Sequence, residues 1–210
     1  MNHAFPYSRF ESHLYRLYRI FIFKPFLCKL GKHVFISPYV RLQSMQHISI
    51  GARSFIGRGT LIQPITRYLA KTFTPLVEIG EGVYIGNNCT ISASAEILIE
   101  NGVTIGDHVY IGGGRHGYED PSESVINQDL VIGSVRICKN AWIGYGSFIA
   151  SAGEVEIGEH AVIAANSVVT KSVPAFTIVA GAPARPVKYY EAQQNKWVSV
   201  ESSAAVGKLQ

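Results

Sequence analysis

Cysteines are few in this sequence, and dense clusters of basic residues are missing. The three cysteines, Cys28, Cys89 and Cys138, show no metal-binding spacing such as CxxC, and an odd number cannot all pair. We therefore expect buried, reduced thiols and a reducing compartment. The net charge of +4 is mild, and no dense Lys/Arg cluster interleaved with aromatic residues lies along the repeats. This pattern argues against a nucleic-acid-binding protein.

Long apolar runs are also missing, so no segment is predicted to span a bilayer, and we find no small-residue cleavage site of a signal peptide. One apolar stripe at helical spacing runs through Phe10, Leu14, Leu17 and Phe21 until a proline ends it. Residues 1–29 are predicted to form an amphipathic helix that caps the domain behind it. The basic residues around the stripe leave open an added role as a membrane-surface anchor. We expect a cytoplasmic protein, free or peripheral at the inner face of the membrane.

What the sequence has in abundance is aliphatic residues in steps of six. Neither a strand, with period two, nor a helix, with period 3.6, keeps a residue inward at every sixth position for so long. A triangular parallel β-helix does, because each hexad forms one flat side and three sides make a coil. The steps form six sets of three: Leu30, Ile36, Leu42; Ile50, Ile56, Ile62; Ile79, Ile85, Ile91; Ile99, Ile105, Ile111; Ile137, Ile143, Ile149; and Ile157, Ile163, Val169.

The joins between these sets predict where the chain leaves the coil. In order, they measure 8, 17, 8, 26 and 8 residues, so each exceeds the step of six and each follows the third hexad. Every extra residue therefore falls at one corner of the prism. The two long insertions, near residues 66–75 and 112–136, are predicted to project from that edge. Loops gathered on one edge of a rigid solenoid are where a binding or catalytic surface is expected.

Several motifs in the repeat region resemble a known family. The hexads IGEGVY, IGNNCT, IGDHVY and IGYGSF, the stretch GGGRHGYEDP, the run AWIG and the block VIAANSVVTKSVPAFTIVAGAPARPVK all occur in the chain. Together they resemble the left-handed β-helix hexapeptide acyltransferases, in the branch of the maltose, galactoside and xenobiotic O-acetyltransferases and of surface-polysaccharide sugar acetyltransferases. The resemblance covers residues 30–188. It implies an all-β, left-handed parallel β-helix, a homotrimer, acetyl-CoA as co-substrate, and active sites between neighbouring prisms. Residues 189–210 are expected to form a short helix and a polar tail.

His116 lies in the longer insertion, between glycines, and by resemblance matches the family's catalytic histidine. A sugar hydroxyl is a poor nucleophile, and a neutral imidazole can accept its proton as it attacks a thioester. We therefore predict His116 as general base. Glu119 and Asp120 are candidates for orienting its ring, with a solvated acidic loop as the alternative.

For the acceptor, the resemblance points to Asn88, which matches an asparagine that faces the sugar in the galactoside and maltose enzymes. Tyr118 and Asp120, beside His116, complete the predicted acceptor-binding set. Five residues after Asn88, where those relatives have an acceptor-binding aspartate, this chain has Ala93. This departure puts their particular acceptors in doubt. A corner turn or asparagine ladder is the alternative role for Asn88.

For the donor, the resemblance points to a set of residues in the last coils. In the family, backbone groups at such positions bind the pantetheine arm, and basic residues lie near the phosphates, for which charged donors are suited. Isolated bases can also be ordinary surface charges. The predicted acetyl-CoA-binding residues are Trp142, Ala165, Thr170, Lys171, Arg185 and Lys188.

The predicted activity is direct acetyl transfer from acetyl-CoA to a hydroxyl of a saccharide, nucleotide sugar or lipid-linked sugar, in lipopolysaccharide, capsule or other envelope polysaccharide synthesis. N-acetylation of an amino sugar is the nearest alternative, and a catalytically silent scaffold or sugar-binding prism is another. A metal enzyme of the γ-carbonic anhydrase type would use His108, His116 and His160, whose spacing shows no paired-ligand pattern. We predict no metal.

Overall fold

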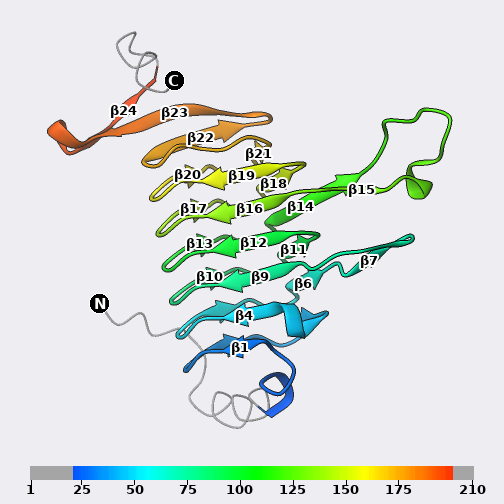
Figure 1. Ribbon diagram of the computed structural model, residues 1–210. Helices are drawn as coiled ribbons and strands as arrows, with labels where there is room; N and C mark the ends of the chain where they lie inside the picture. The colour runs from blue at the N-terminus through cyan, green and yellow to red at the C-terminus, as the bar shows by residue number, and fades with distance from the viewer. Residues whose placement is uncertain (1–20, 201–210) are drawn as a thin grey trace.

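The main body of the protein is a stack of coils, seen edge-on in Figure 1. The computed structural model describes residues 21–200. Each coil contributes one short strand to each of three sheets, and successive coils pair in parallel within each sheet. The all-β class and the parallel sheets agree with the predicted β-helix. The left hand of the coil stays a prediction.

The three sheets are the sides of a prism. Side 1 contains β1 (Lys29–Leu30), β4 (Ile48–Ile50), β9 (Leu76–Ile79), β12 (Glu96–Ile99), β16 (Ser134–Ile137) and β19 (Glu154–Ile157). Side 2 contains β2 (Phe35–Ile36), β5 (Phe55–Ile56), β10 (Tyr84–Ile85), β13 (Thr104–Ile105), β17 (Trp142–Ile143), β20 (Val162–Ile163) and β22 (Thr177–Gly181). Side 3 contains β3 (Arg41–Leu42), β6 (Leu61–Pro64), β11 (Thr90–Ala93), β14 (Tyr110–His116), β18 (Phe148–Ser151) and β21 (Val168–Val169). We name the corners between them edge 1–2, edge 2–3 and edge 3–1.

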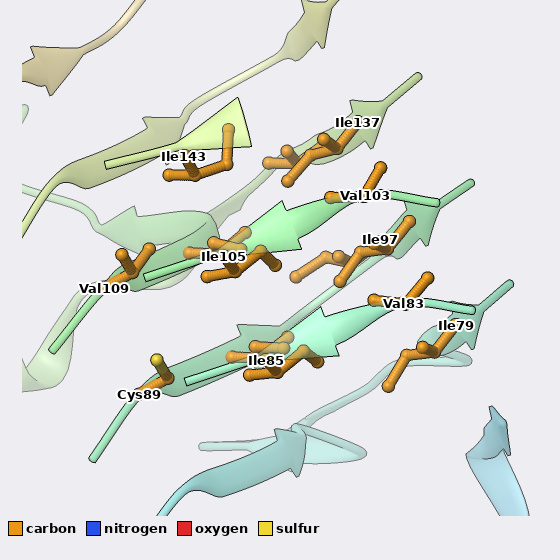
Figure 2. Close-up of a cluster of buried hydrophobic side chains, with 14 of the residues drawn as sticks. Ile79, Val83, Ile85, Cys89, Ile97, Val103, Ile105, Val109, Ile137 and Ile143 are labelled. Atoms are coloured by element: carbon orange, nitrogen blue, oxygen red, sulfur yellow. The ribbon is translucent and has the colours of Figure 1, made fainter. Parts of the chain in front are cut away.

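The predicted step residues stack in register inside the prism. On side 2, Ile85 is paired with Ile56 below it and with Ile105 above it, and all three are at most 1% exposed. Figure 2 shows such side chains from successive coils pointing into one continuous core. Full burial of each isoleucine contributes roughly 1.5–3 kcal/mol. The six-residue period therefore predicted the core correctly.

The joins of eight residues have a simple cause. At the join between Ile91 and Ile99, the flanking strands β11 and β12 are each four residues long, whereas the side 2 strands β10 and β13 have two. The two added residues thus lengthen the strands that meet at edge 3–1, and they place Ala93, which is 0% exposed, in the core.

Only part of the cysteine prediction holds. All three cysteines are free, but Cys28 is exposed, Cys138 is half-buried and Cys89 is buried. Burial raises the pKa of the Cys89 thiol to about 11, so this thiol stays protonated at neutral pH.

The N-terminal cap is described only at its end. Residues 21–23 are helical, Phe23 packs against the core, and Leu27 is buried. The rest of the predicted helix lies outside the described residues. Between residues 21 and 200, no helix is long and apolar enough to cross a membrane.

The predicted C-terminal helix from Tyr189 to Trp197 is wrong. Side 2 continues antiparallel from β22 into β23 (Ala184–Glu191), the turn η3 (Ala192–Gln194) and β24 (Lys196–Ser199). Aromatic and β-branched residues favour strands, and the Tyr190 and Trp197 rings pair across the hairpin with centroids 5.5 Å apart. Beyond residue 200, the predicted tail lies outside the described residues.

Candidate active site

Both long insertions leave the prism at edge 3–1, as predicted, and run outward side by side in Figure 1. The shorter one forms the hairpin of β7 (Arg67–Tyr68) and β8 (Lys71–Thr72). The longer one extends β14 outward, includes the turn η2 (Val125–Asn127), and returns through β15 (Leu130–Ile132) antiparallel to β14. Lys71 Nζ forms a 2.7 Å ion pair with Asp129 Oδ2 across the two insertions.

His116 is the last residue of β14, and its side chain is exposed. Its main chain is paired with Leu130 in the β14–β15 ladder, and its carbonyl oxygen accepts a hydrogen bond from Arg115 Nη1 at 3.0 Å. The backbone of the predicted general base is therefore held by regular structure, although it lies in an insertion.

The imidazole of His116 meets the other insertion. Its Nδ1 lies 3.1 Å from the hydroxyl oxygen of Tyr68, and the two rings meet edge to face, with centroids 5.3 Å apart. The Tyr68 hydroxyl also donates to the carbonyl oxygen of Ile126 at 3.0 Å. The sequence prediction did not include Tyr68, although the shared edge of the two insertions was the signal that could have suggested it.

The expectation that Glu119 or Asp120 orients His116 is wrong, because both carboxylates are engaged elsewhere. Glu119 accepts a 2.6 Å hydrogen bond from Arg115 Nη2 and another from the Tyr118 backbone, and these contacts lower the pKa of Glu119 to about 2. Asp120 accepts from the hydroxyl and backbone of Ser122, which lowers its pKa. Both carboxylates organise the loop itself.

Of the predicted acceptor residues, Tyr118 and Asp120 lie in the same loop as His116. Tyr118 is 64% exposed, and the Arg115 guanidinium lies 4.2 Å from its ring centroid. Tyr118 therefore presents an aromatic surface to solvent in the loop that follows His116.

Asn88 lies at a different corner, edge 2–3, where the chain passes from β10 to β11. Its φ of 53° is in the left-handed region, which asparagine tolerates better than most residues. The corner-turn role that the sequence left open is thus realised, and the exposed side chain is still available to a ligand. Ala93 is 0% exposed and faces the core, so this position offers nothing to an acceptor.

Three of the predicted donor residues gather at the C-terminal end of the prism. Thr170, Lys171 and Arg185 line one pocket of about 320 Å³, together with Ser172 and Pro186 among others. The Arg185 guanidinium is exposed and donates to the carbonyl oxygen of Ala184 at 2.9 Å. A pocket with two cationic side chains suits a phosphate-bearing ligand.

The other predicted donor residues lie apart from this pocket. Trp142 is 54% exposed on the outer face of side 2, Ala165 is exposed at edge 2–3, and Lys188 is exposed on β23. One chain therefore does not bring all of the predicted residues together.

The histidines of the metal alternative do not converge within one chain. His108 lies at edge 2–3, His116 at edge 3–1 and His160 at edge 1–2. Among residues 21–200, no group of three or more His, Cys, Asp or Glu side chains is placed to hold a metal ion.

Comparison with known proteins agrees with this architecture. A family model described as the hexapeptide repeat of succinyl-transferase matches residues 77–114 and 134–171. The galactoside O-acetyltransferase of Escherichia coli is 32% identical over 52% of this chain and 55% of its own length. The chain therefore contains hexapeptide repeats and is similar in sequence to hexapeptide-repeat acetyltransferases.

Two other proteins extend the comparison. WbbJ of Escherichia coli, named for O-acetyl transfer in lipopolysaccharide biosynthesis, is 31% identical over 60% of this chain and 63% of its own length. The chain spans roughly half the length of the curated relatives it matches. A variant of the N-acyltransferase AntD from Bacillus cereus, solved with dTDP and coenzyme A, has the same fold, with a TM-score of 0.69, 21% identity, and coverage of 90% of this chain and 92% of AntD.

Proposed function

We propose that this protein transfers an acetyl group from acetyl-CoA to a hydroxyl of a saccharide, nucleotide sugar or lipid-linked sugar used in envelope polysaccharide synthesis. The observation that carries the proposal is the exposed imidazole of His116, which lies at the end of β14 and contacts Tyr68 of the shorter insertion. Sequence similarity to acetyltransferases supports acetyl transfer, and the names of the galactoside enzyme and of WbbJ support a sugar hydroxyl as acceptor.

In the proposed reaction, a neutral His116 accepts the hydroxyl proton while the sugar oxygen attacks the thioester carbonyl carbon. A new C–O bond forms, and the carbonyl electron pair moves to oxygen. When the tetrahedral intermediate collapses, the C–S bond breaks, and the coenzyme A thiolate leaves and takes the proton back from the imidazolium. No acyl-enzyme is needed, because the acceptor attacks directly.

Thr170, Lys171 and Arg185 are proposed to hold the phosphates of the donor in their shared pocket. Trp142, Ala165 and Lys188 are proposed to contact the donor from side 2, edge 2–3 and β23. That AntD, with the same fold, was crystallised with coenzyme A supports a coenzyme A site in this architecture.

We propose a homotrimer, because the candidate residues divide between two edges. Asn88 and Ala165 lie on edge 2–3, whereas His116, Thr170 and Lys171 lie on edge 3–1. In a closed ring of three prisms, edge 2–3 of one copy can face edge 3–1 of the next. The outer faces of sides 2 and 3 support such contacts, since they carry aromatic stacks: Phe35, Phe55 and Tyr84 on side 2, and Tyr110 and Phe148 on side 3.

Mixing two inactive variants tests this arrangement. Asn88→Gly removes the amide without backbone strain, since glycine adopts a positive φ freely. His116→Ala removes the base. If each site joins two copies, co-refolded trimers of the two variants regain about a quarter of wild-type activity, the share of interfaces with both groups intact. A site within one chain would give no recovery.

The acceptor is identified by turnover. Purified protein and acetyl-CoA are incubated with a panel of nucleotide sugars and oligosaccharides while thiol release is followed, with His116→Ala as the control. Alkaline hydroxylamine then separates the two kinds of product, because it removes an O-acetyl ester and leaves an amide. Failure to turn over any acceptor, together with failure to bind acetyl-CoA, would refute the proposal in favour of a silent prism.

N-acyl transfer to an amino sugar is the second candidate function. The observation that favours it is the fold shared with AntD, an N-acyltransferase that was crystallised with dTDP and coenzyme A. A product that resists hydroxylamine would identify N-acyl transfer as the reaction.

For location, we propose a cytoplasmic protein with peripheral contact at the membrane through residues 1–29, which binding to anionic vesicles would test.

A further inference from the structure

The contact between His116 and Tyr68 indicates which ring nitrogen of His116 carries a proton. The phenol hydroxyl of Tyr68 has a single hydrogen, and two groups lie within bonding distance of its oxygen: the Ile126 carbonyl oxygen at 3.0 Å and His116 Nδ1 at 3.1 Å. A carbonyl oxygen can only accept. The hydroxyl hydrogen therefore points to Ile126, and the oxygen lone pairs remain for His116.

We propose that Tyr68 is a positioning residue that holds the neutral His116 ring as the Nδ1–H tautomer. Nδ1 then donates to the phenol oxygen, and Nε2 carries the lone pair. This inference rests on the proposed function, because it names Nε2 as the atom that takes the acceptor proton. Tyr68 acts through His116 and has no part in the bond changes.

The chemistry of this arrangement differs from that of a carboxylate partner. A neutral phenol accepts from Nδ1–H both before and after Nε2 gains a proton, so the ring keeps its orientation throughout the transfer. Tyr68 adds no negative charge that would hold the imidazolium tightly. The loop carboxylate of Glu119 is paired with Arg115 at 2.6 Å and does not compete for the ring.

Two further contacts keep Tyr68 in place. Its hairpin is tied to the longer insertion by the ion pair between Lys71 and Asp129, and its ring meets the imidazole edge to face. Substitution of Tyr68 by phenylalanine therefore keeps the ring contact and removes only the hydroxyl.

The test is a tautomer measurement on the full-length protein labelled with ¹⁵N-histidine. Nitrogen chemical shifts distinguish protonated from unprotonated ring nitrogens, and the His116 signals are assigned by their loss in His116→Ala. In the neutral His116 ring of the wild type we expect Nδ1 protonated and Nε2 unprotonated. In Tyr68→Phe we expect a mixture rich in the Nε2–H tautomer, which free imidazole side chains prefer in water. Tyr39→Phe is the matched control, since Tyr39 is exposed on the first coil and keeps its ring stacked under Arg58.

Kinetics give a second measure. Loss of one neutral hydrogen bond predicts a fall in kcat of about three- to tenfold in Tyr68→Phe, with the KM for acetyl-CoA unchanged and Tyr39→Phe at the wild-type rate. A wild-type His116 with its proton on Nε2, or a tautomer unaltered by Tyr68→Phe, overturns the inference. If the wild type transfers acetyl to no acceptor, the proposed function fails, and the tautomer measurement decides the inference by itself.

Discussion

Replacing Lys171 or Arg185 with alanine should weaken acetyl-CoA binding, because both side chains line the pocket at the end of the prism. Hydrogen bonds to charged groups contribute roughly 1.5–3 kcal/mol. Both residues are exposed, and one guanidinium nitrogen of Arg185 is already used by the Ala184 carbonyl oxygen. We therefore expect the lower end, about 1.5 kcal/mol, which is about a tenfold increase in Kd for each variant.

Titration calorimetry with acetyl-CoA and with dephospho-coenzyme A measures this effect and locates it. If Lys171 or Arg185 contacts the phosphate that dephospho-coenzyme A lacks, the wild type binds dephospho-coenzyme A more weakly than acetyl-CoA. The alanine variant of the contacting residue should then bind the two ligands with equal affinity. Lys139→Ala is the matched control, because it removes the same charge from an exposed residue at edge 1–2. Wild-type affinity in both pocket variants would refute the assignment, and so would an equal loss in Lys139→Ala, which would point to net charge alone.

Three further outcomes are expected. His116→Ala should lower kcat about 10²–10⁴-fold, the usual contribution of general-base catalysis, with acetyl-CoA affinity unchanged in calorimetry. Ile105→Ala should lower the free energy of unfolding by about 2–5 kcal/mol in a denaturant titration, because its side chain is 1% exposed in the middle of the stack; the outward-facing Thr104→Ala should change it little. The Glu119 carboxyl should titrate at about 2 by NMR, so its contact with Arg115 persists as pH falls through 4 and is lost only near pH 2. In Arg115→Ala the midpoint should rise towards the ordinary value, about 4.3, and an unchanged midpoint would contradict the contact.

The β-helix could be predicted from the sequence because its core requires only that aliphatic residues recur at a fixed spacing. A hexad needs an aliphatic residue at a fixed step, and Ile85 between Ile56 and Ile105 satisfies it regardless of what lies far away in the chain. The edge of the insertions followed from the same arithmetic. The C-terminal hairpin could not be predicted from the six-residue spacing, because the repeat ends at Val169 and the pairing of β23 depends on the neighbouring strand β22.

Within the candidate site, the features that follow from the six-residue repeat could again be predicted from the sequence. The edge that carries His116 could be derived from the spacing, and the role of His116 came from the family resemblance. Its partner Tyr68 could not be derived, because the contact joins two insertions whose shapes no repeat dictates. Glu119 and Asp120 were candidates for orienting groups because they are near His116 in sequence, but Glu119 accepts a hydrogen bond from Arg115 and Asp120 accepts one from Ser122.

The division between a regular body and irregular insertions also bears on the acceptor. Core positions of the prism are fixed by packing, and Ala93 shows that a position used for acceptor binding in some relatives is closed inside this core. In the proposed reaction, acceptor specificity then comes from surfaces that packing leaves free, which are the two insertions on edge 3–1 and the exposed residues of edge 2–3. The insertions that carry His116 and Tyr68 also carry the exposed side chains of Leu69, Tyr118 and Ile126. Exchanging these segments between relatives, while the prism is kept, should therefore change the acceptor and leave acetyl-CoA binding intact.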